Sequence, residues 1–118
     1  MTALRTVTVP TLDAGPVTLP EPSWCAGHPN DPTGYRVDLH HSAPVPVPEG
    51  LIGLDAELVE FPFGQRPVPL SVYVELVAPG ATLDPDGLRD FAAGLAARAA
   101  LLVEFADRLA TLRAGGAW

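Results

Sequence analysis

The chain has 118 residues, among them 14 prolines and 11 glycines, and a formal net charge of −7 at pH 7. This length suits one small domain with a single modest core, and a hydrophobic content of 47% indicates that the chain folds. Arginine supplies all the positive charge, and its seven residues are scattered along the chain. Because an acidic chain without a basic stripe repels phosphate, we expect binding neither to nucleic acid nor to an anionic membrane.

The single cysteine excludes an internal disulfide bond, and with it a disulfide-based secreted scaffold. The first ten residues lack the apolar run of a signal peptide, and no stretch approaches the roughly 18 apolar residues of a membrane-spanning helix. These features favour a cytoplasmic protein.

The N-terminal third is expected to hold one strand and a long connector. Residues 4–9 alternate and are rich in β-branched side chains, which predicts a strand that ends at Pro10. Residues 10–34 follow neither a helical nor a strand period and contain six prolines, which predicts a proline-rich loop. A loop of this length needs an anchor inside a compact domain, and the ring of Trp24 could provide one by burial.

Three strands are predicted between residues 35 and 78. Residues 35–41 alternate between apolar and polar side chains, and the prolines that follow them end the pairing. Residues 54–63 predict a second strand whose apolar face changes parity near residues 58–59, as a bulge or bend would cause. Residues 70–78 alternate regularly and predict the third.

One long helix is predicted over residues 84–114. Asp84 suits the N-cap, Pro85 suits the first helical position, and two glycines follow the last apolar residue. The central apolar stripe consists of Leu88, Phe91, Ala92, Leu95, Ala99, Leu102, Ala106 and Leu109. These elements together predict an α+β fold in one domain over residues 1–118: an antiparallel three- to four-stranded sheet packed by the C-terminal helix, with loop 10–34 clasped to one edge.

The helix is expected to contact more than its own sheet. Its apolar arc is roughly 200° wide, whereas covering one surface requires roughly 100°. The proline-rich loops could cover the extra face, or a second copy of the chain or a partner helix could do so. The side chains expected at such a contact are Leu101, Phe105, Leu112 and Trp118.

The side chains best suited to chemistry are Cys25 and His28, followed by His40 and His41. Zinc favours tetrahedral coordination by nitrogen and sulfur, and a Cys-x2-His pair that bends at Gly27 can direct both donors at one ion. Adjacent histidines on a strand point to opposite faces, so only one should be a ligand. We favour His41, because it shares its parity with the apolar face.

The fourth zinc ligand is left open by the pattern. Asp31, Glu21 or a water molecule could supply it. The alternative to a metal site is a small buried cysteine with histidines at the surface.

The segments 22–28 and 37–42 resemble DUF6907, a family of small actinobacterial domains of unknown function. The resemblance rests on a Pro-x-Trp-Cys…His…His-Ser pattern, on strands after it and on an Ala/Leu-rich C-terminal helix. In many members a further cysteine lies four residues before the one that matches Cys25, and here that position is Glu21. If that cysteine is a ligand in the family, Glu21 either replaces it or leaves a weaker site. The resemblance thus supports a metal site and implies no activity.

These features favour a non-enzymatic accessory or protein-interaction module with a structural Cys/His zinc site. Its partner would be another protein or a second copy of the chain, bound through the C-terminal helix. One alternative is a small hydrolase-like metal enzyme that uses the same site, with Glu21 or Asp31 as the base. Another is a transcription-linked regulator that acts through protein contacts.

Overall fold

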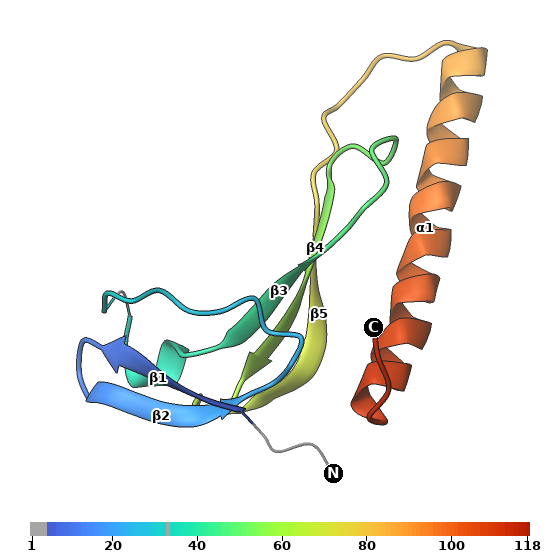
Figure 1. Ribbon diagram of the computed structural model, residues 1–118. Coiled ribbons are helices and arrows are strands. Elements are labelled where there is room, and N and C mark those ends of the chain that lie inside the picture. The colour runs from blue at the N-terminus through green and yellow to red at the C-terminus, as the bar shows by residue number, and fades with distance from the viewer. Residues whose placement is uncertain (1–4, 33) are drawn as a thin grey trace. The chain divides into compact units, whose positions relative to one another are not determined.

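The computed structural model describes residues 5–32 and 34–118. Its elements are β1 (Arg5–Thr11), β2 (Gly15–Glu21), the 3₁₀ turn η1 (Arg36–Asp38), β3 (His41–Val45), β4 (Leu54–Phe61), β5 (Val68–Leu76) and α1 (Pro85–Arg113) (Figure 1). Strands β1 and β2 form a two-stranded antiparallel sheet, and β3, β4 and β5 form a three-stranded antiparallel sheet in chain order. The predicted α+β class is confirmed.

The chain divides into two compact units. The first comprises the described residues up to Pro44 together with Glu57–Tyr73, and the second comprises Val45–Ala56 together with Val74–Trp118. The first unit therefore holds the β1–β2 hairpin and η1, and the second holds α1. Strands β3, β4 and β5 each contribute residues to both units. The single domain expected over residues 1–118 stays a prediction.

The β1–β2 hairpin occupies residues for which a loop was predicted, so the loop prediction is wrong between residues 10 and 21. The predicted strand began at Leu4, which lies outside the described residues; β1 continues past Pro10 to Thr11. Every second side chain of the hairpin faces inward, and Val9 and Leu19 are each only 3% exposed.

The prolines of the hairpin all stand at alternate positions. Pro10 pairs with Pro16, and Pro20 lies four residues further along β2, so all three belong to the same type of cross-strand pair. Because proline has no N–H group, these must be non-hydrogen-bonded pairs. Thr8 and Thr18 form a pair of the same type, and their hydroxyl oxygens lie 2.8 Å apart, as the close side chains of such pairs allow. A proline-rich sequence can therefore form a regular hairpin.

The predicted strand over residues 35–41 is wrong, because its centre forms η1. The Arg36 N–H donates to the side chain of Asp13 over 2.8 Å, and the Asp38 N–H donates to the Tyr35 carbonyl over 3.0 Å. These hydrogen bonds take up backbone groups that a strand would use. The Tyr35 side chain, which the alternation assigned to the buried face, is 54% exposed.

The later strands agree with the sequence except at their ends. β3 includes Pro44, which is tolerated because β3 lies at the edge of its sheet. Strands were predicted over residues 54–63 and 70–78, and β4 and β5 lie at these positions with ends shifted by up to two residues. The neighbouring residues Leu58 and Val59 are both buried. The apolar face of this strand was expected to change from one side to the other at these two residues.

The predicted helix is confirmed, with α1 running over Pro85–Arg113. The Asp84 carboxylate accepts the N–H of Gly87 over 2.7 Å and caps the first turn. At the other end the Gly115 N–H donates to the Leu112 carbonyl over 3.1 Å. Among the described residues, no helix combines the length and apolarity needed to cross a membrane.

The face of α1 that is covered differs from the face predicted to be central. The only buried residue of α1 is Phe105, whose ring centroid lies 5.7 Å from that of Trp118. The Arg98 guanidinium donates to the Ile52 carbonyl over 2.7 Å. Arg98 and Phe105 lie on the same side of α1, and this side therefore faces the segment before β4. Of the five large side chains of the predicted central stripe, Leu109 is half-buried and the other four are exposed: Leu88, Phe91, Leu95 and Leu102.

The residues expected at a partner contact thus lie on the more covered flank. Leu101, Leu112 and Trp118 are half-buried, and Phe105 is 3% exposed within the chain. Their role in binding a partner stays a prediction.

Gly53 provides a test of the second unit. It has a φ of +83°, its carbonyl accepts the Val77 N–H over 2.8 Å, and a Cβ there would collide with the Val77 carbonyl oxygen. We expect Gly53→Ala to lower the free energy of unfolding by about 1–3 kcal/mol. Chemical denaturation followed by circular dichroism measures this change.

The matched control is Gly50→Ala, because a Cβ at Gly50 meets only open space. It should change the free energy of unfolding by less than about 0.5 kcal/mol. Equal stabilities of the Gly53→Ala and Gly50→Ala variants would contradict the role of the Gly53–Val77 contact.

Candidate metal centre

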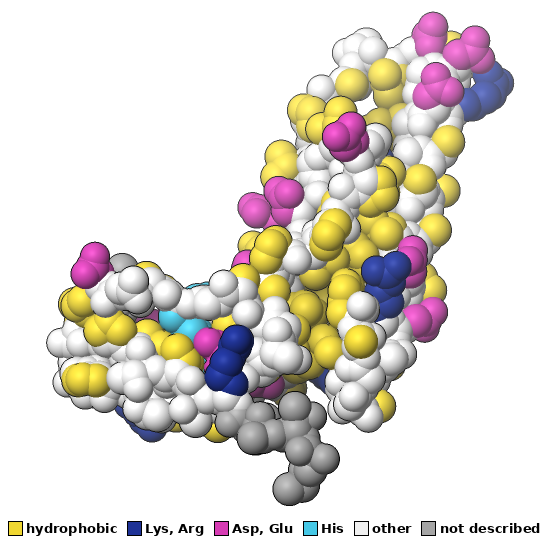
Figure 2. All heavy atoms as spheres, viewed as in Figure 1, with side chains coloured by type: hydrophobic (Ala, Val, Ile, Leu, Met, Phe, Trp, Pro, Cys, Tyr) yellow, Lys and Arg dark blue, Asp and Glu magenta, His cyan; other side chains and the backbone are white. Residues whose placement is uncertain are grey.

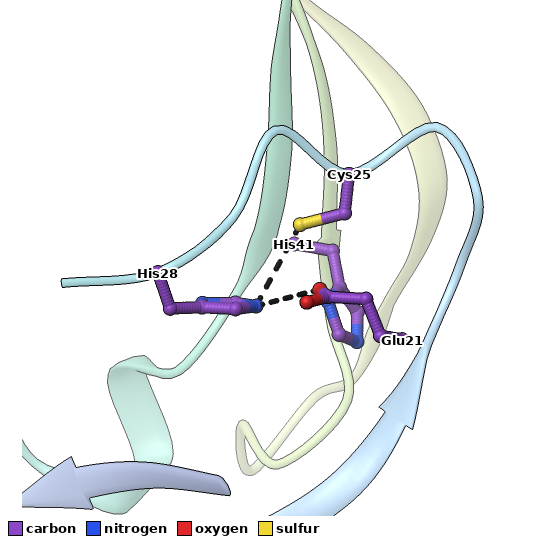
Figure 3. Close-up of side chains that lie close together, drawn as sticks. All are labelled: Glu21, Cys25, His28 and His41. Carbon is purple, nitrogen blue, oxygen red and sulfur yellow. Dashed lines mark hydrogen bonds and ion pairs between the residues drawn. The ribbon is translucent and has the colours of Figure 1, made fainter. Parts of the chain in front are cut away.

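Four polar side chains converge inside the first unit: Glu21, Cys25, His28 and His41 (Figure 3). Their potential ligand atoms all lie within 4.8 Å of one another. Glu21 is the last residue of β2, Cys25 and His28 lie in the loop that follows, and His41 is the first residue of β3. Three separate segments of the chain therefore meet at one point.

Local backbone structure directs the Cys25 side chain to this point. The Cys25 N–H donates to the Pro22 carbonyl over 3.1 Å, which closes a turn directly after β2. The Ala26 N–H then donates to the Ser42 carbonyl over 2.9 Å and ties the turn to β3. Gly27 has a φ of +110°, a backbone conformation that glycine adopts without strain, and it reverses the chain towards His28.

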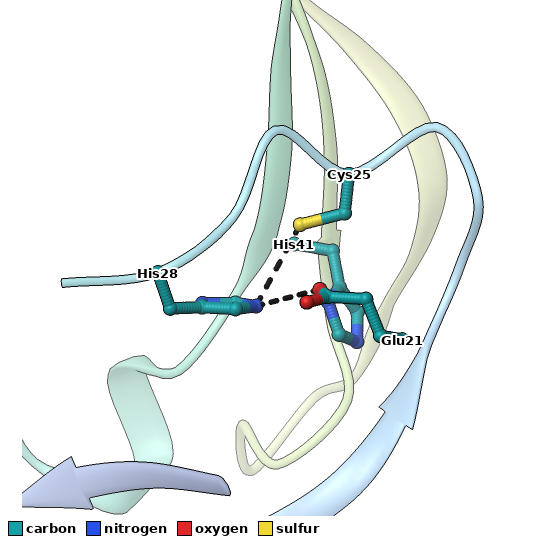
Figure 4. Close-up of polar contacts among 4 residues, drawn as sticks. All are labelled: Glu21, Cys25, His28 and His41. Carbon is teal, nitrogen blue, oxygen red and sulfur yellow. Dashed lines mark hydrogen bonds and ion pairs between the residues drawn. The ribbon is translucent and has the colours of Figure 1, made fainter. Parts of the chain in front are cut away.

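The separations between the donor atoms fit a tetrahedral ion. Cys25 Sγ lies 3.6 Å from His28 Nε2, and Glu21 Oε1 lies 2.8 Å from His28 Nε2 and 3.2 Å from His41 Nδ1 (Figure 4). Typical zinc bond lengths at tetrahedral angles place a sulfur and a nitrogen about 3.6 Å apart, and two nitrogen or oxygen ligands about 3.3 Å apart. Three of the six separations are therefore within about half an ångström of those in a tetrahedral zinc shell, and the other three lie within 4.8 Å.

The cluster is shielded from solvent. The side chains of Glu21, His28 and His41 are 5%, 7% and 3% exposed, and Cys25 is 7% exposed. The ring of Trp24 meets that of His41 edge-on, with centroids 6.2 Å apart. Polar groups buried to this extent must be paired with one another or with a cation.

The carboxyl of Glu21 favours its ionised form. Burial by itself raises its pKa, but hydrogen bonds from Cys25, His28 and His41, together with the charge of His28, outweigh burial, and the pKa lies below its ordinary value. A buried carboxylate that remains ionised is a suitable ligand for a divalent cation.

The thiol of Cys25 favours its protonated form in the protein without metal. Burial raises its pKa, and the Glu21 carboxylate raises it further, whereas backbone hydrogen bonds from Gly27 and Ser42 lower it. Metal binding at this sulfur would release its proton, and the same two N–H groups would then stabilise the thiolate.

Two residues considered from the sequence lie outside the cluster. The His40 ring stacks on Phe61 with centroids 4.8 Å apart, and its Nδ1 lies 3.0 Å from the Asp38 carbonyl oxygen. Asp31 is exposed and does not belong to the group. Of the open choices for a fourth donor, the structure brings Glu21 to Cys25, His28 and His41. Glu21 lies two residues after the buried Leu19, so both side chains point to the same face of β2. This indication can be used only when β2 is recognised as a strand.

Residues 6–111 match the family model DUF6907, described as a domain of unknown function, and the chain belongs to this family. The matched range includes all four residues of the cluster and most of α1. A search of curated proteins and a search of solved structures each found no match. The resemblance inferred from the Trp-Cys and His-His segments is confirmed at the level of the family.

The lowered pKa of Glu21 predicts a pH dependence of stability in the metal-free protein. A folded pKa below the ordinary value of about 4.3 means that the stability contributed by ionised Glu21 is fully present above that pH. This stability is lost as the pH falls through the lower folded pKa. At pH 7, with a chelator present, Glu21→Gln should lower the free energy of unfolding by about 1.5–3 kcal/mol.

Denaturant titrations between pH 7 and pH 3 measure this difference, which should shrink below about pH 4. Glu49→Gln is the control, because Glu49 is exposed and lies outside the cluster. A Glu21→Gln effect that stayed constant down to pH 3 would rule out an ionised Glu21 as its source.

Proposed function

We propose that the protein binds one zinc ion through Glu21, Cys25, His28 and His41, and that this ion stabilises a non-enzymatic protein-interaction module. The observation that carries the proposal is the convergence of four buried donor atoms within 4.8 Å of one another. A mixed set of thiolate, imidazole and carboxylate suits zinc better than it suits calcium or magnesium, which prefer oxygen ligands alone.

A structural role follows from the number and origin of the donors. Four protein ligands fill a tetrahedral shell, whereas catalytic zinc sites keep a position for water or substrate. The donors come from β2, from the loop after it and from β3, so an ion would cross-link segments between which the chain forms little regular secondary structure. A cross-link of this kind compensates for the small core of a short chain.

An interaction role is supported by the surface of the second unit. Figure 2 shows apolar side chains along α1, and several of its large apolar residues are more than 40% exposed. Contiguous exposed apolar surface on a small protein typically marks a site of association.

A metal-dependent enzyme is the second candidate, because a hollow adjoins the cluster. It has a volume of about 130 Å³ and lies within the first unit. His28 lines one side, and Tyr35, Asp38 and His40 contribute polar groups. In this alternative Glu21 would leave the metal and serve as a base, which would open one coordination position towards the hollow.

Metal analysis with two adjacent histidines tests the zinc site. The purified wild-type protein should contain close to one zinc per chain, and His41→Ala should lose at least about tenfold in zinc affinity. His40→Ala is the matched control, because His40 is the next residue in the chain and lies outside the cluster; it should retain the metal. Elemental analysis and a competition titration with a chromophoric chelator provide the measurements.

Two results would refute the zinc site. One is wild-type protein without a transition metal after zinc supplementation, and the other is equal loss of zinc in the two histidine variants.

Replacement of zinc by cobalt separates the structural role from the enzymatic one. A cobalt ion held by four protein donors should keep its visible absorption spectrum when azide or imidazole is added, because no exchangeable position remains. A spectrum that changed in a saturable way with either ligand would favour the enzyme. Chelation should also lower the melting temperature if the ion is structural, as monitored by circular dichroism.

A further inference from the structure

The exposed face of α1 has a regular seven-residue repeat. Leucines recur at Leu88, Leu95, Leu102 and Leu109, and alanines recur at Ala92, Ala99 and Ala106. Each alanine lies four residues after one leucine and three before the next, so the two series form one line along a helix, the spacing of a coiled-coil seam. We use the name Leu/Ala seam for these residues.

The Leu/Ala seam is available for contact. Leu88, Leu95 and Leu102 are 56%, 44% and 37% exposed, the three alanines are exposed as well, and Leu109 at the end of the seam is half-buried. The seam lies roughly 90° around the helix from the flank that holds Phe105. Of its leucines, Leu95 also borders a hollow that Leu76 and Val77 of the same unit line, so this side chain is partly shared with the chain's own surface. At 100° per residue, no charged side chain falls within about 60° of the seam between Leu88 and Ala110.

We propose that the Leu/Ala seam binds the same seam of a second copy of this chain, with the two α1 helices antiparallel. This inference goes beyond the zinc site, which lies in the first unit. A seam that pairs with itself across a two-fold axis gives a closed dimer.

The alternation of large and small side chains favours the antiparallel direction. When two such helices run antiparallel, Leu95 of one copy faces Ala99 of the other, Leu102 faces Ala92 and Leu88 faces Ala106. Every layer then holds one large and one small side chain, which fills space evenly and lets the helix axes approach to about 8 Å. In a parallel pair leucines would face leucines and alanines would face alanines, which leaves a gap at each alanine layer.

Charge complementarity selects this register. Arg89 and Asp107 lie on the same side of the seam, one near each end of it. With Leu95 opposite Ala99, Arg89 of one copy comes close to Asp107 of the other, and the two-fold axis repeats this pair. A shift by one heptad towards the C-terminus would instead place Arg113, which continues the alanine series, opposite Leu88, and a charge in the apolar contact would oppose that register.

The length of the seam is compatible with a stable dimer. The segment from Leu88 to Ala106 is about 28 Å long at 1.5 Å per residue. Two helices packed along that length bury apolar area on both copies and keep the charged Arg89 and Asp107 at the edge of the contact, an apolar centre with a polar rim as in homodimer interfaces.

Two alanines on opposite sides of α1 test the proposal. Ala99 lies at the middle of the seam, and Ala97 lies on the opposite side of the helix; both are exposed. Sedimentation velocity of the full chain over a range of concentrations should reveal a dimer for the wild type. Ala99→Glu should raise the dimer dissociation constant by about tenfold or more, because it places a charge in an apolar contact. Ala97→Glu should leave the constant unchanged.

A double variant tests the antiparallel direction. When Leu95→Lys is combined with Ala99→Glu, the introduced opposite charges face each other in the antiparallel pair, and dimerisation should recover relative to Ala99→Glu alone. In a parallel pair like charges would meet, and dimerisation would weaken further. The second result would overturn the proposed geometry.

The proposal also fails if the wild type remains a monomer at all concentrations, or if Ala99→Glu and Ala97→Glu dimerise equally. Circular dichroism of each variant establishes that α1 is intact. If Ala99→Glu lost helix content, the charge exchange Arg89→Asp with Asp107→Arg would replace it. The exchange should keep the wild-type dissociation constant, whereas Asp107→Arg alone should weaken dimerisation; equal constants for the two would overturn the register.

Discussion

The buried carboxylate of Glu21 is the constraint on which the first unit depends. The alternation of β2 directs this side chain inward, and an unpaired charge there would cost several kcal/mol. His28 and His41 approach it from two further segments and meet it at 2.8 and 3.2 Å. Among the described residues between Glu21 and His41, the short turn η1 is the only regular structure. These polar contacts therefore help to hold the segment in place, together with the hydrogen bonds from Ala26 to Ser42 and from Arg36 to Asp13. A zinc ion at the same point would replace these hydrogen bonds by bonds to the metal and would join the same segments.

The sequence predicted those parts of the fold that depend on local signals. The bounds of α1 follow from Asp84 and from the glycines after it, because a cap and a stop act within one turn of the helix. Local signals in the sequence could not predict which face of α1 is covered. That choice depends on Trp118, which returns to Phe105, and on the hydrogen bond from Arg98 to Ile52, 46 residues earlier in the chain. Such contacts leave no trace in the periodicity of the helix.

Some residues of the candidate site could likewise be predicted from a local pattern, and others depend on contacts between distant segments. The spacing of Cys25 and His28 around Gly27 is a local pattern, and from it both residues could be predicted as donors at one site. His41 was favoured over His40 because of an alternating strand over residues 35–41, but this strand does not form; His41 is buried because β3 starts there. Glu21 is one of three choices for the fourth donor in the sequence, since its orientation depends on the β1–β2 hairpin. The prolines of this hairpin led to the prediction of a loop.

Those prolines have a further consequence. Pro10, Pro16 and Pro20 occupy non-hydrogen-bonded pairs, so the N–H groups they lack would have pointed away from the hairpin, along its two outer edges. A two-stranded sheet leaves both edges open, and an incoming strand from another molecule needs donors there. Because donors are missing on each edge, the hairpin is a poor template for intermolecular sheet growth despite its valines and threonines. The three prolines that make β1 and β2 difficult to predict from the sequence therefore also protect these strands from aggregation.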